Sequence, residues 1–327
     1  MAAMSEFVLP LLGAGILTVL SLFILLKKAD WVPFDRPNAR SLHVNPTPRI
    51  GGLAMLMGVV PVLLWASVPG YGLLLSLSLA LSVVSLADDY LDLSARIRLL
   101  VHALAAGVFL HFKIDQSWGT NLALWLLLVW MTNLYNFMDG ADGLAGGMAL
   151  FGFGAYGLAA WLGGAMNMAV VSWTIASASL GFLLFNFPPA RVFMGDAGSI
   201  PLGFLAGALG TLGWKEGVWP AWFPLLIFSP FLFDASATLL RRGLRRAKIW
   251  QAHKSHYYQR LVRLGLTHRQ LAMVEYGLMA AVAASALWVL RNQREAWIEL
   301  TLAWAIVYIL LGLAVDAIWR RQHGHEL

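Results

Sequence analysis

Apolar runs of about twenty residues recur along this chain, and they constrain its fold more than any other feature. A helix of that length spans the hydrocarbon core of a bilayer. Only 12% of the 327 residues are charged, about half the share of an ordinary soluble domain. A water-soluble globule with so few charges could not cover its surface with polar groups. The sequence therefore predicts an all-α polytopic integral membrane protein.

The runs predict about eleven transmembrane helices. Ten is the alternative, because the turns at Pro69-Gly70 and Gly163-Gly164 are very short and the run 199–214 is also short. The spans lie near residues 7–26, 50–67, 70–87, 97–113, 121–138, 143–163, 166–185, 199–214, 219–240, 271–290 and 298–318. The longest stretch between them has about 30 residues, too few for a separate soluble domain. We therefore expect residues 1–327 to form a single transmembrane domain.

Basic residues predict the orientation. With the N-terminus outside, 19 of the 23 Lys and Arg residues fall in inner loops and 4 in outer loops. That bias is typical of a cytoplasmic face, so the C-terminus should lie inside. The inner loops lie near 27–49, 88–97, 138–143, 186–199 and 241–270.

The net charge of +6 does not by itself indicate a nucleic-acid partner, because the position of the charges matters more in a membrane protein. We expect no nucleic acid to bind. The chain has no Cys, which excludes disulfides and thiolate metal sites. Any metal must be held by oxygen or imidazole.

Two clusters of polar residues lie at the inner ends of predicted spans. Asp88 and Asp89 end the third span, with Asp92 one helical turn further on. Such carboxylates repel one another unless a cation joins them, which favours a Mg²⁺ or general-base site; a solvated helix end is the alternative. Asn133, Asn136 and Asp139 recur every three residues at the end of the fifth span, with Asp142 just beyond. This stripe favours a functional site over a polar contact between helices.

Three further inner segments carry groups that suit an anionic substrate. Asp196 precedes a helix, where an N-terminal anion site or a simple cap could form, and Arg191 lies close enough to meet a phosphate. Arg49 follows a loop shaped by prolines, which is either interfacial or closes over a substrate. His253, His256 and Arg260 suit a diphosphate and a sugar better than zinc, since no further His completes a zinc site. The basic run before them also fits anionic headgroups.

In this order, the motifs resemble the cytoplasmic signatures of the polyprenyl-phosphate N-acetylhexosamine-1-phosphate transferases (glycosyltransferase family 4). The matching strings are Pro46-Thr-Pro-Arg-Ile-Gly-Gly52, Asp88-Asp89-x-x-Asp92, Asn133-x-x-Asn136-x-x-Asp139-Gly-x-Asp142-Gly, Phe193-Met-Gly-Asp196-x-Gly-Ser199 and His253-x-x-His256-Tyr-Tyr-Gln-Arg260. The chain is more similar to the enzymes that start O-antigen or other surface polysaccharides (the WecA and WbpL type) than to MraY-type peptidoglycan precursor transferases, which carry a denser histidine motif.

The resemblance implies a multi-pass enzyme of the bacterial cytoplasmic (inner) membrane with a periplasmic N-terminus. Such an enzyme transfers N-acetylhexosamine-1-phosphate from a UDP-sugar to undecaprenyl phosphate, releases UMP and requires Mg²⁺, with Mn²⁺ as a substitute. Because phosphoryl transfer depends on positioning and electrostatics, charge must be neutralised where the two anions meet.

The resemblance also implies roles for individual residues. Asp88 would deprotonate or orient the lipid phosphate, with Asp89 beside it. Asp196 and Asn136 would hold the metal. The remaining candidates would bind substrate: Asn133, Asp139, Asp142, Arg49, Arg191, His253, His256 and Arg260.

Two other functions stay open from the sequence. One is the MraY-type reaction. The other is an ion-coupled transporter, which would use ionisable residues within spans, here His102, Asp234 and Glu275. The sequence leaves open the sugar, single or double displacement (we favour single), and whether the protein forms a homodimer.

Overall fold

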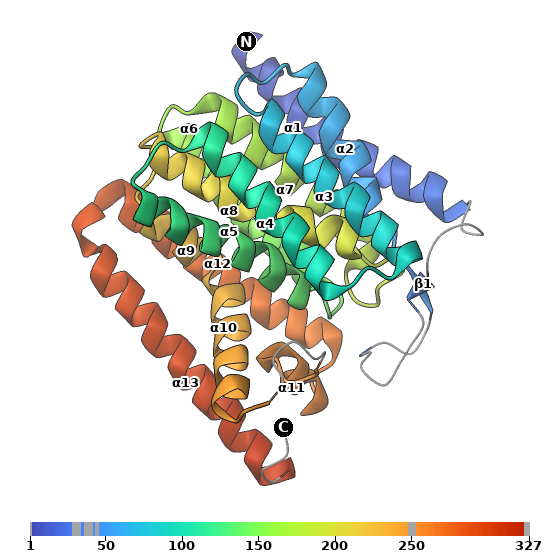
Figure 1. Ribbon diagram of the computed structural model, residues 1–327, viewed down its shortest axis with the longest axis vertical. Coiled ribbons are helices and arrows are strands. Elements are labelled where there is room, and N and C mark those ends of the chain that lie inside the picture. The colour runs from blue at the N-terminus through green and yellow to red at the C-terminus, as the bar shows by residue number, and fades with distance from the viewer. Residues whose placement is uncertain (1, 28–33, 36–41, 43–45, 248–252, 324–327) are drawn as a thin grey trace.

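The computed structural model describes residues 2–27, 34–35, 42, 46–247 and 253–323, and most of them are helical (Figure 1). Parts of the predicted inner loops 27–49 and 241–270 lie outside these residues. The first half of the described chain forms α1 (Ala2–Lys27), α2 (Gly51–Trp65), α3 (Gly72–Leu91), α4 (Ala95–Lys113), α5 (Trp118–Phe137) and α6 (Leu144–Leu162). The second half forms α7 (Met166–Asn186), α8 (Asp196–Lys215), α9 (Trp222–Ile227), α10 (Ser229–Leu244), α11 (Tyr257–Arg263), α12 (His268–Asn292), the 3₁₀ helix η2 (Arg294–Ala296) and α13 (Trp297–His323). Strands β1 (Phe34–Asp35) and β2 (Thr47–Pro48) pair antiparallel.

Within the described ranges, seven helical segments are long and apolar enough to cross a membrane. They are α3, α4, α6, α7, α8, α12 and the stretch that joins η2 to α13. Shorter apolar helices lie in α1 and α2. The predicted class, an all-α polytopic membrane protein, is therefore confirmed.

Two local predictions need correction. The span 219–240 was expected as one helix, but the chain breaks at Phe228 between α9 and α10, which is inclined to its neighbours (Figure 1). Pro230 in the first turn of α10 explains the break, because proline has no N–H to donate and its ring clashes with the preceding turn. The inner loop 241–270 contains a short helix, α11.

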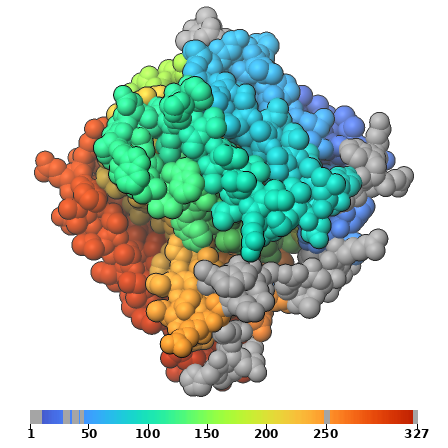
Figure 2. Space-filling view, in the orientation of Figure 1, coloured from blue at the N-terminus to red at the C-terminus, as the bar shows by residue number. Residues whose placement is uncertain are grey.

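Helix α8 lies at the centre of the bundle, and α13 lies at its edge. The most apolar window of α8 is 94% buried, against 17% for that of α13, which runs along one side of the molecule (Figure 2). Small residues let α5 approach α8 closely: a Cβ added to Gly203 would lie 2.6 Å from the backbone oxygen of Met131. The exposed apolar side chains of α13 suit contact with lipid.

A backbone pairing brings the start of α2 against the start of α8. The N–H groups of Gly51 and Gly52 donate to the carbonyls of Phe193 (2.9 Å) and Met194 (2.8 Å). A Cβ on Gly52 would lie 2.3 Å from the backbone nitrogen of Gly198, so only glycine allows this approach. The pairing carries the preceding residues of the first inner loop to the N-terminus of α8.

Candidate active site

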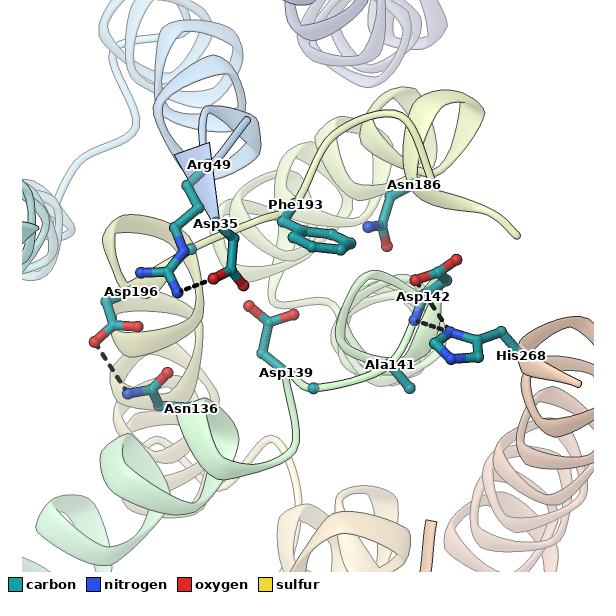
Figure 3. A pocket seen from close by; sticks show the side chains of 12 residues that line it. Asp35, Arg49, Asn136, Asp139, Ala141, Asp142, Asn186, Phe193, Asp196 and His268 are labelled. Carbon is teal, nitrogen blue, oxygen red and sulfur yellow. Dashed lines mark hydrogen bonds and ion pairs between the residues drawn. The ribbon is translucent and has the colours of Figure 1, made fainter. Parts of the chain in front are cut away.

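Five connections between helices meet at one end of the bundle and enclose a polar cavity (Figure 3). Four of them line it: the loop before α2, the end of α5 with the α5–α6 loop, the α7–α8 segment and the start of α12. The turn between α3 and α4 lies beside them and contacts them through ion pairs. The cavity is lined by Asp35, Arg49, Asn136, Asp139, Gly140, Ala141, Asp142, Asn186, Phe193, Gly195, Asp196 and His268. Five of these residues are sequence candidates: Arg49, Asn136, Asp139, Asp142 and Asp196.

The two candidate metal ligands lie side by side. Asp196 begins α8 directly after Gly195, whose φ of +71° favours glycine. The amide Nδ2 of Asn136 donates to Oδ2 of Asp196 over 3.3 Å, and the hydroxyl of Ser199 donates to Oδ1 of Asn136 over 3.0 Å. The end of α5 and the start of α8 thus present a carboxylate and an amide together.

Two arginines hold the neighbouring carboxylates. Arg49 pairs with Asp35 (2.8 Å) and Asp89 (3.6 Å), and so joins the first inner loop to α3. Arg98, in the first turns of α4, pairs with Asp88 (3.0 Å) and lies 3.9 Å from Asp196. The sequence prediction assigned Arg98 no role. The sequence offered one signal for such a role: Arg98 follows the Asp88 cluster after the short turn that joins α3 to α4.

Asp88 also shapes that turn. Its Oδ1 accepts the N–H of Leu93 over 2.6 Å, where α3 has ended and the chain reverses into α4. Neither Asp88 nor Asp89 lines the cavity. Asp89 is connected to it through Arg49, which does, and Asp88 through Arg98, which lies near Asp196.

Asp139 adds a buried carboxyl group to the cavity wall near Asp196. Among the residues that the structure describes, charges act on its carboxyl but no hydrogen-bond donor does. Burial, followed by the nearby Asp196, raises the pKa of Asp139 well above its ordinary value, although Arg49 opposes this. Around Asp196, carboxyl groups outnumber guanidinium groups, and such an oxygen-rich surplus of negative charge suits a hard divalent cation.

The other end of the cavity is built around Asp142. Its Oδ2 accepts the N–H of Ala190 (3.0 Å), and its Oδ1 lies 3.1 Å from Nδ1 of His268. Asn186 braces the same loop by accepting the N–H of Gly143 (2.9 Å). The sequence prediction gave no role to Asn186 or His268; His268 is 126 positions from Asp142, and its one signal was a location in an inner loop.

The late loop packs against the end of α5. His256 precedes α11 and stacks on His253, with ring centroids 4.9 Å apart. Burial, then His256, lowers the pKa of His253 to about 4, so its imidazole is neutral at physiological pH. The hydroxyl of Tyr258 donates to the carbonyl of Phe137 over 3.1 Å. Both candidate histidines therefore lie beside the site without lining its cavity.

Asp234 organises this loop, a role that the sequence prediction missed. Its carboxylate accepts the N–H groups of Tyr257 (2.8 Å) and Tyr258 (2.9 Å), and it lies 3.3 Å from Nδ1 of His256. A carboxylate at the first N–H groups of a helix caps it. In this structure Asp234 therefore serves as a cap for α11.

Three predicted substrate-binding residues lie elsewhere. Arg260 is buried in an ion pair with Asp316 and lies over the ring of Trp319. Arg191 lies 5.1 Å from the ring centroid of Phe185. Asn133 donates to the carbonyl of its own helix, four residues back, over 2.7 Å. The structure does not bring these three side chains to the cavity.

Comparison with known proteins is consistent with this arrangement. The model of glycosyl transferase family 4 matches residues 71–213, the segment that carries α3 to α8. The decaprenyl-phosphate N-acetylglucosaminephosphotransferase of Mycolicibacterium smegmatis is 31% identical over 85% of this chain and 81% of its own length. The chain belongs to glycosyl transferase family 4.

Other members of the family are similar over much of their length. The probable undecaprenyl-phosphate N-acetylglucosaminyl 1-phosphate transferase of Bacillus subtilis is 29% identical over 86% of this chain and 83% of its own. The undecaprenyl-phosphate alpha-N-acetylglucosaminyl 1-phosphate transferase of Escherichia coli K12 is 29% identical over 95% of this chain and 91% of its own. These matches confirm the resemblance to the polyprenyl-phosphate N-acetylhexosamine-1-phosphate transferases.

Proposed function

We propose that this member of family 4 transfers N-acetylhexosamine-1-phosphate from a UDP-sugar to undecaprenyl phosphate, with release of UMP. One observation carries the proposal: Asp196, Asn136 and Arg98 meet at the ends of apolar helices, where a charged donor and a membrane lipid can both reach them. The names of the relatives make UDP-N-acetylglucosamine the first donor to test.

The reaction exchanges one phosphorus–oxygen bond for another. An oxygen of the lipid phosphate attacks the sugar-bearing phosphorus of the donor, and the bond to the UMP phosphate breaks. Both reactants are anions, so positive charge is needed where they meet, and Arg98 and Arg49 supply it. We favour this single displacement over a covalent aspartyl intermediate. Asp88, beside Arg98, suits the role of deprotonating or orienting the lipid phosphate, and Asp89 holds Arg49.

The residues at Asp196 fit Mg²⁺ held together with substrate. Within the described ranges no group of three His, Asp or Glu residues forms a ready metal site. Mg²⁺ is commonly bound through one or two carboxylates plus substrate phosphates, and the carboxylate of Asp196 matches that donor set. Asn136 would join it by turning its amide oxygen, which now accepts from Ser199, toward the ion. When bound, the ion would neutralise the donor diphosphate; Mn²⁺ would serve similarly.

The nucleotide would occupy the rest of the cavity. Asp139 and Asp142 line it, and the ring of Phe193 offers an aromatic surface to a base. His253 and His256 lie beside the end of α5, where the sugar would emerge from the cavity.

We further propose that the chain spans the bacterial inner membrane eleven times, with a periplasmic N-terminus and the cavity facing the cytoplasm. The distribution of Lys and Arg supports this orientation. Reporter fusions after Arg49, Asp142 and Lys254 and at the C-terminus should all indicate cytoplasm. A C-terminal fusion that reports the outside would contradict the count.

The reaction itself is tested with purified protein, undecaprenyl phosphate and a panel of UDP-sugars, with the lipid product identified by mass spectrometry. We expect a lipid-diphosphate N-acetylhexosamine, absent from the Asp196→Asn variant. A product formed only from UDP-N-acetylmuramoyl-pentapeptide would instead indicate the MraY-type reaction, and no lipid product from any donor would overturn the proposal.

A further inference from the structure

His268 lies beside Asp142 at the end of the cavity opposite Asp196 (Figure 3). Its Nδ1 lies 3.1 Å from Oδ1 of Asp142 and 3.3 Å from the backbone nitrogen of the same residue. The imidazole also donates to the backbone carbonyl of Leu42 in the first inner loop. One side chain thus joins the start of α12 to the α5–α6 loop and to Leu42.

The two contacts with Asp142 correspond to the two protonation states of the ring. When Nδ1 carries no proton, it accepts the backbone N–H of Asp142; when it carries one, it donates to Oδ1. The other ring nitrogen donates to Leu42 in either state, because a carbonyl can only accept. His268 therefore keeps both segments tied whether or not it is charged.

The helix that carries His268 is itself well anchored. Thr267 and Gln270 form a reciprocal capping box at the start of α12. About two helical turns after His268, the hydroxyl of Tyr276 donates to the carbonyl of Gly143 over 2.7 Å. Helix α12 thus fixes both the side chain of Asp142 and the backbone beside it, while Ala190 holds the second carboxylate oxygen.

We propose that His268 is a positioning residue for the nucleotide of the donor: it fixes Asp142 at the end of the cavity opposite Asp196. This inference rests on the proposed function. Since the reacting diphosphate lies at the Asp196 end, loss of His268 should weaken donor binding and raise KM while it changes kcat little.

The test measures UDP binding by calorimetry with Mg²⁺, together with KM and kcat for the donor, on detergent-purified variants. His268→Leu removes both hydrogen bonds and should weaken UDP binding about 10-fold to 100-fold. His268→Gln should bind within about threefold of wild type, because its amide can donate to Leu42 and accept from Asp142. The matched control is His111→Leu. His111 is exposed and lies in the last turn of α4, far along the helix from Arg98, so this variant should bind UDP normally.

A double-variant cycle separates positioning from general structural damage. If His268 acts through Asp142, His268→Leu should cost little further affinity in an Asp142→Ala background. Additive effects of the two changes, or wild-type affinity in a His268→Leu variant with an unchanged Tm, would overturn the inference while the proposed function stands. Absence of UDP binding by folded wild-type protein would overturn the proposed function, and this inference with it.

Discussion

Removal of the positive charge at Arg98 should slow transfer without unfolding the protein. The Arg98 guanidinium lies 3.0 Å from Asp88 and 3.9 Å from Asp196, at the point where the lipid phosphate is proposed to enter. Its side chain is 40% exposed, so both ion pairs are partly screened by solvent. An exposed pair of this kind contributes about 0.2–1 kcal/mol to folding, and Arg98→Met should lower the free energy of unfolding by no more than that.

The effect on the transition state should be larger. Two unit charges 4 Å apart interact by about 1 kcal/mol in water and about 4 kcal/mol near a protein surface. An intermediate value of about 2 kcal/mol suits a half-exposed guanidinium, and it corresponds to about a 30-fold loss of kcat.

The assay is donor turnover at saturating lipid, with Arg96→Met as the matched control. Arg96 lies in the same first turn of α4, is exposed, and makes no ion pair within the described residues. If Arg98→Met turns over like Arg96→Met, Arg98 does not face the reacting phosphates and the electrostatic reasoning is refuted.

Four further outcomes are expected. EDTA should abolish activity, and Mg²⁺ or Mn²⁺ should restore it better than Zn²⁺; full activity in chelator would remove Asp196 from the metal role. Calorimetry should show that Asp196→Asn loses UDP binding, whereas Asp88→Asn keeps it and loses about 10²–10⁴-fold in kcat; equal loss of binding would mean that both serve one metal site. The folded state holds the Asp139 proton more tightly than the unfolded chain, so the stability of the folded state falls as the pH rises above the ordinary carboxyl range. Asp139→Asn should therefore raise Tm more at high pH than at low pH. A gain in Tm that does not depend on pH would contradict this. Gly52→Ala should lower the free energy of unfolding by about 1–3 kcal/mol, because the added methyl group overpacks the contact with α8. The matched control is Gly277→Ala, where the methyl group meets open space. Equal Tm values for the two variants would contradict the close approach of Gly52 to α8.

The helices could be predicted from the sequence because the bilayer sets their length. Apolar runs of about twenty residues mark most of the long helices, and one run is an instructive exception. Between 219 and 240 the hydropathy predicts one span, but Pro230 divides it into α9 and α10. Hydropathy measures where a segment is buried and does not show whether its backbone is continuous.

The candidate site could be predicted only where its residues are close in sequence. The polar stripe that ends α5 is periodic, and two of its residues, Asn136 and Asp139, line the cavity. His268 and Asp142 come from distant elements, so no local pattern joins them. Asp234 shows a different limit, since a buried carboxylate that caps α11 and one that moves protons look alike in a sequence.

Arg260 illustrates why residue type alone is insufficient. An arginine close in sequence to two histidines suits a diphosphate. In the structure, however, Arg260 pairs with Asp316 of α13, which is 56 positions away. Which anion an arginine meets is decided by tertiary packing, and the sequence does not show that choice.

The nucleotide released during turnover tests the account most directly. Transfer of a sugar phosphate leaves UMP, whereas transfer of the sugar alone leaves UDP. Chromatography of a reaction that contains purified protein, UDP-N-acetylhexosamine and undecaprenyl phosphate should show UMP formed in equal amount to the lipid product, and only when the lipid is present. Release of UDP, or nucleotide release that does not require the lipid, would contradict the account.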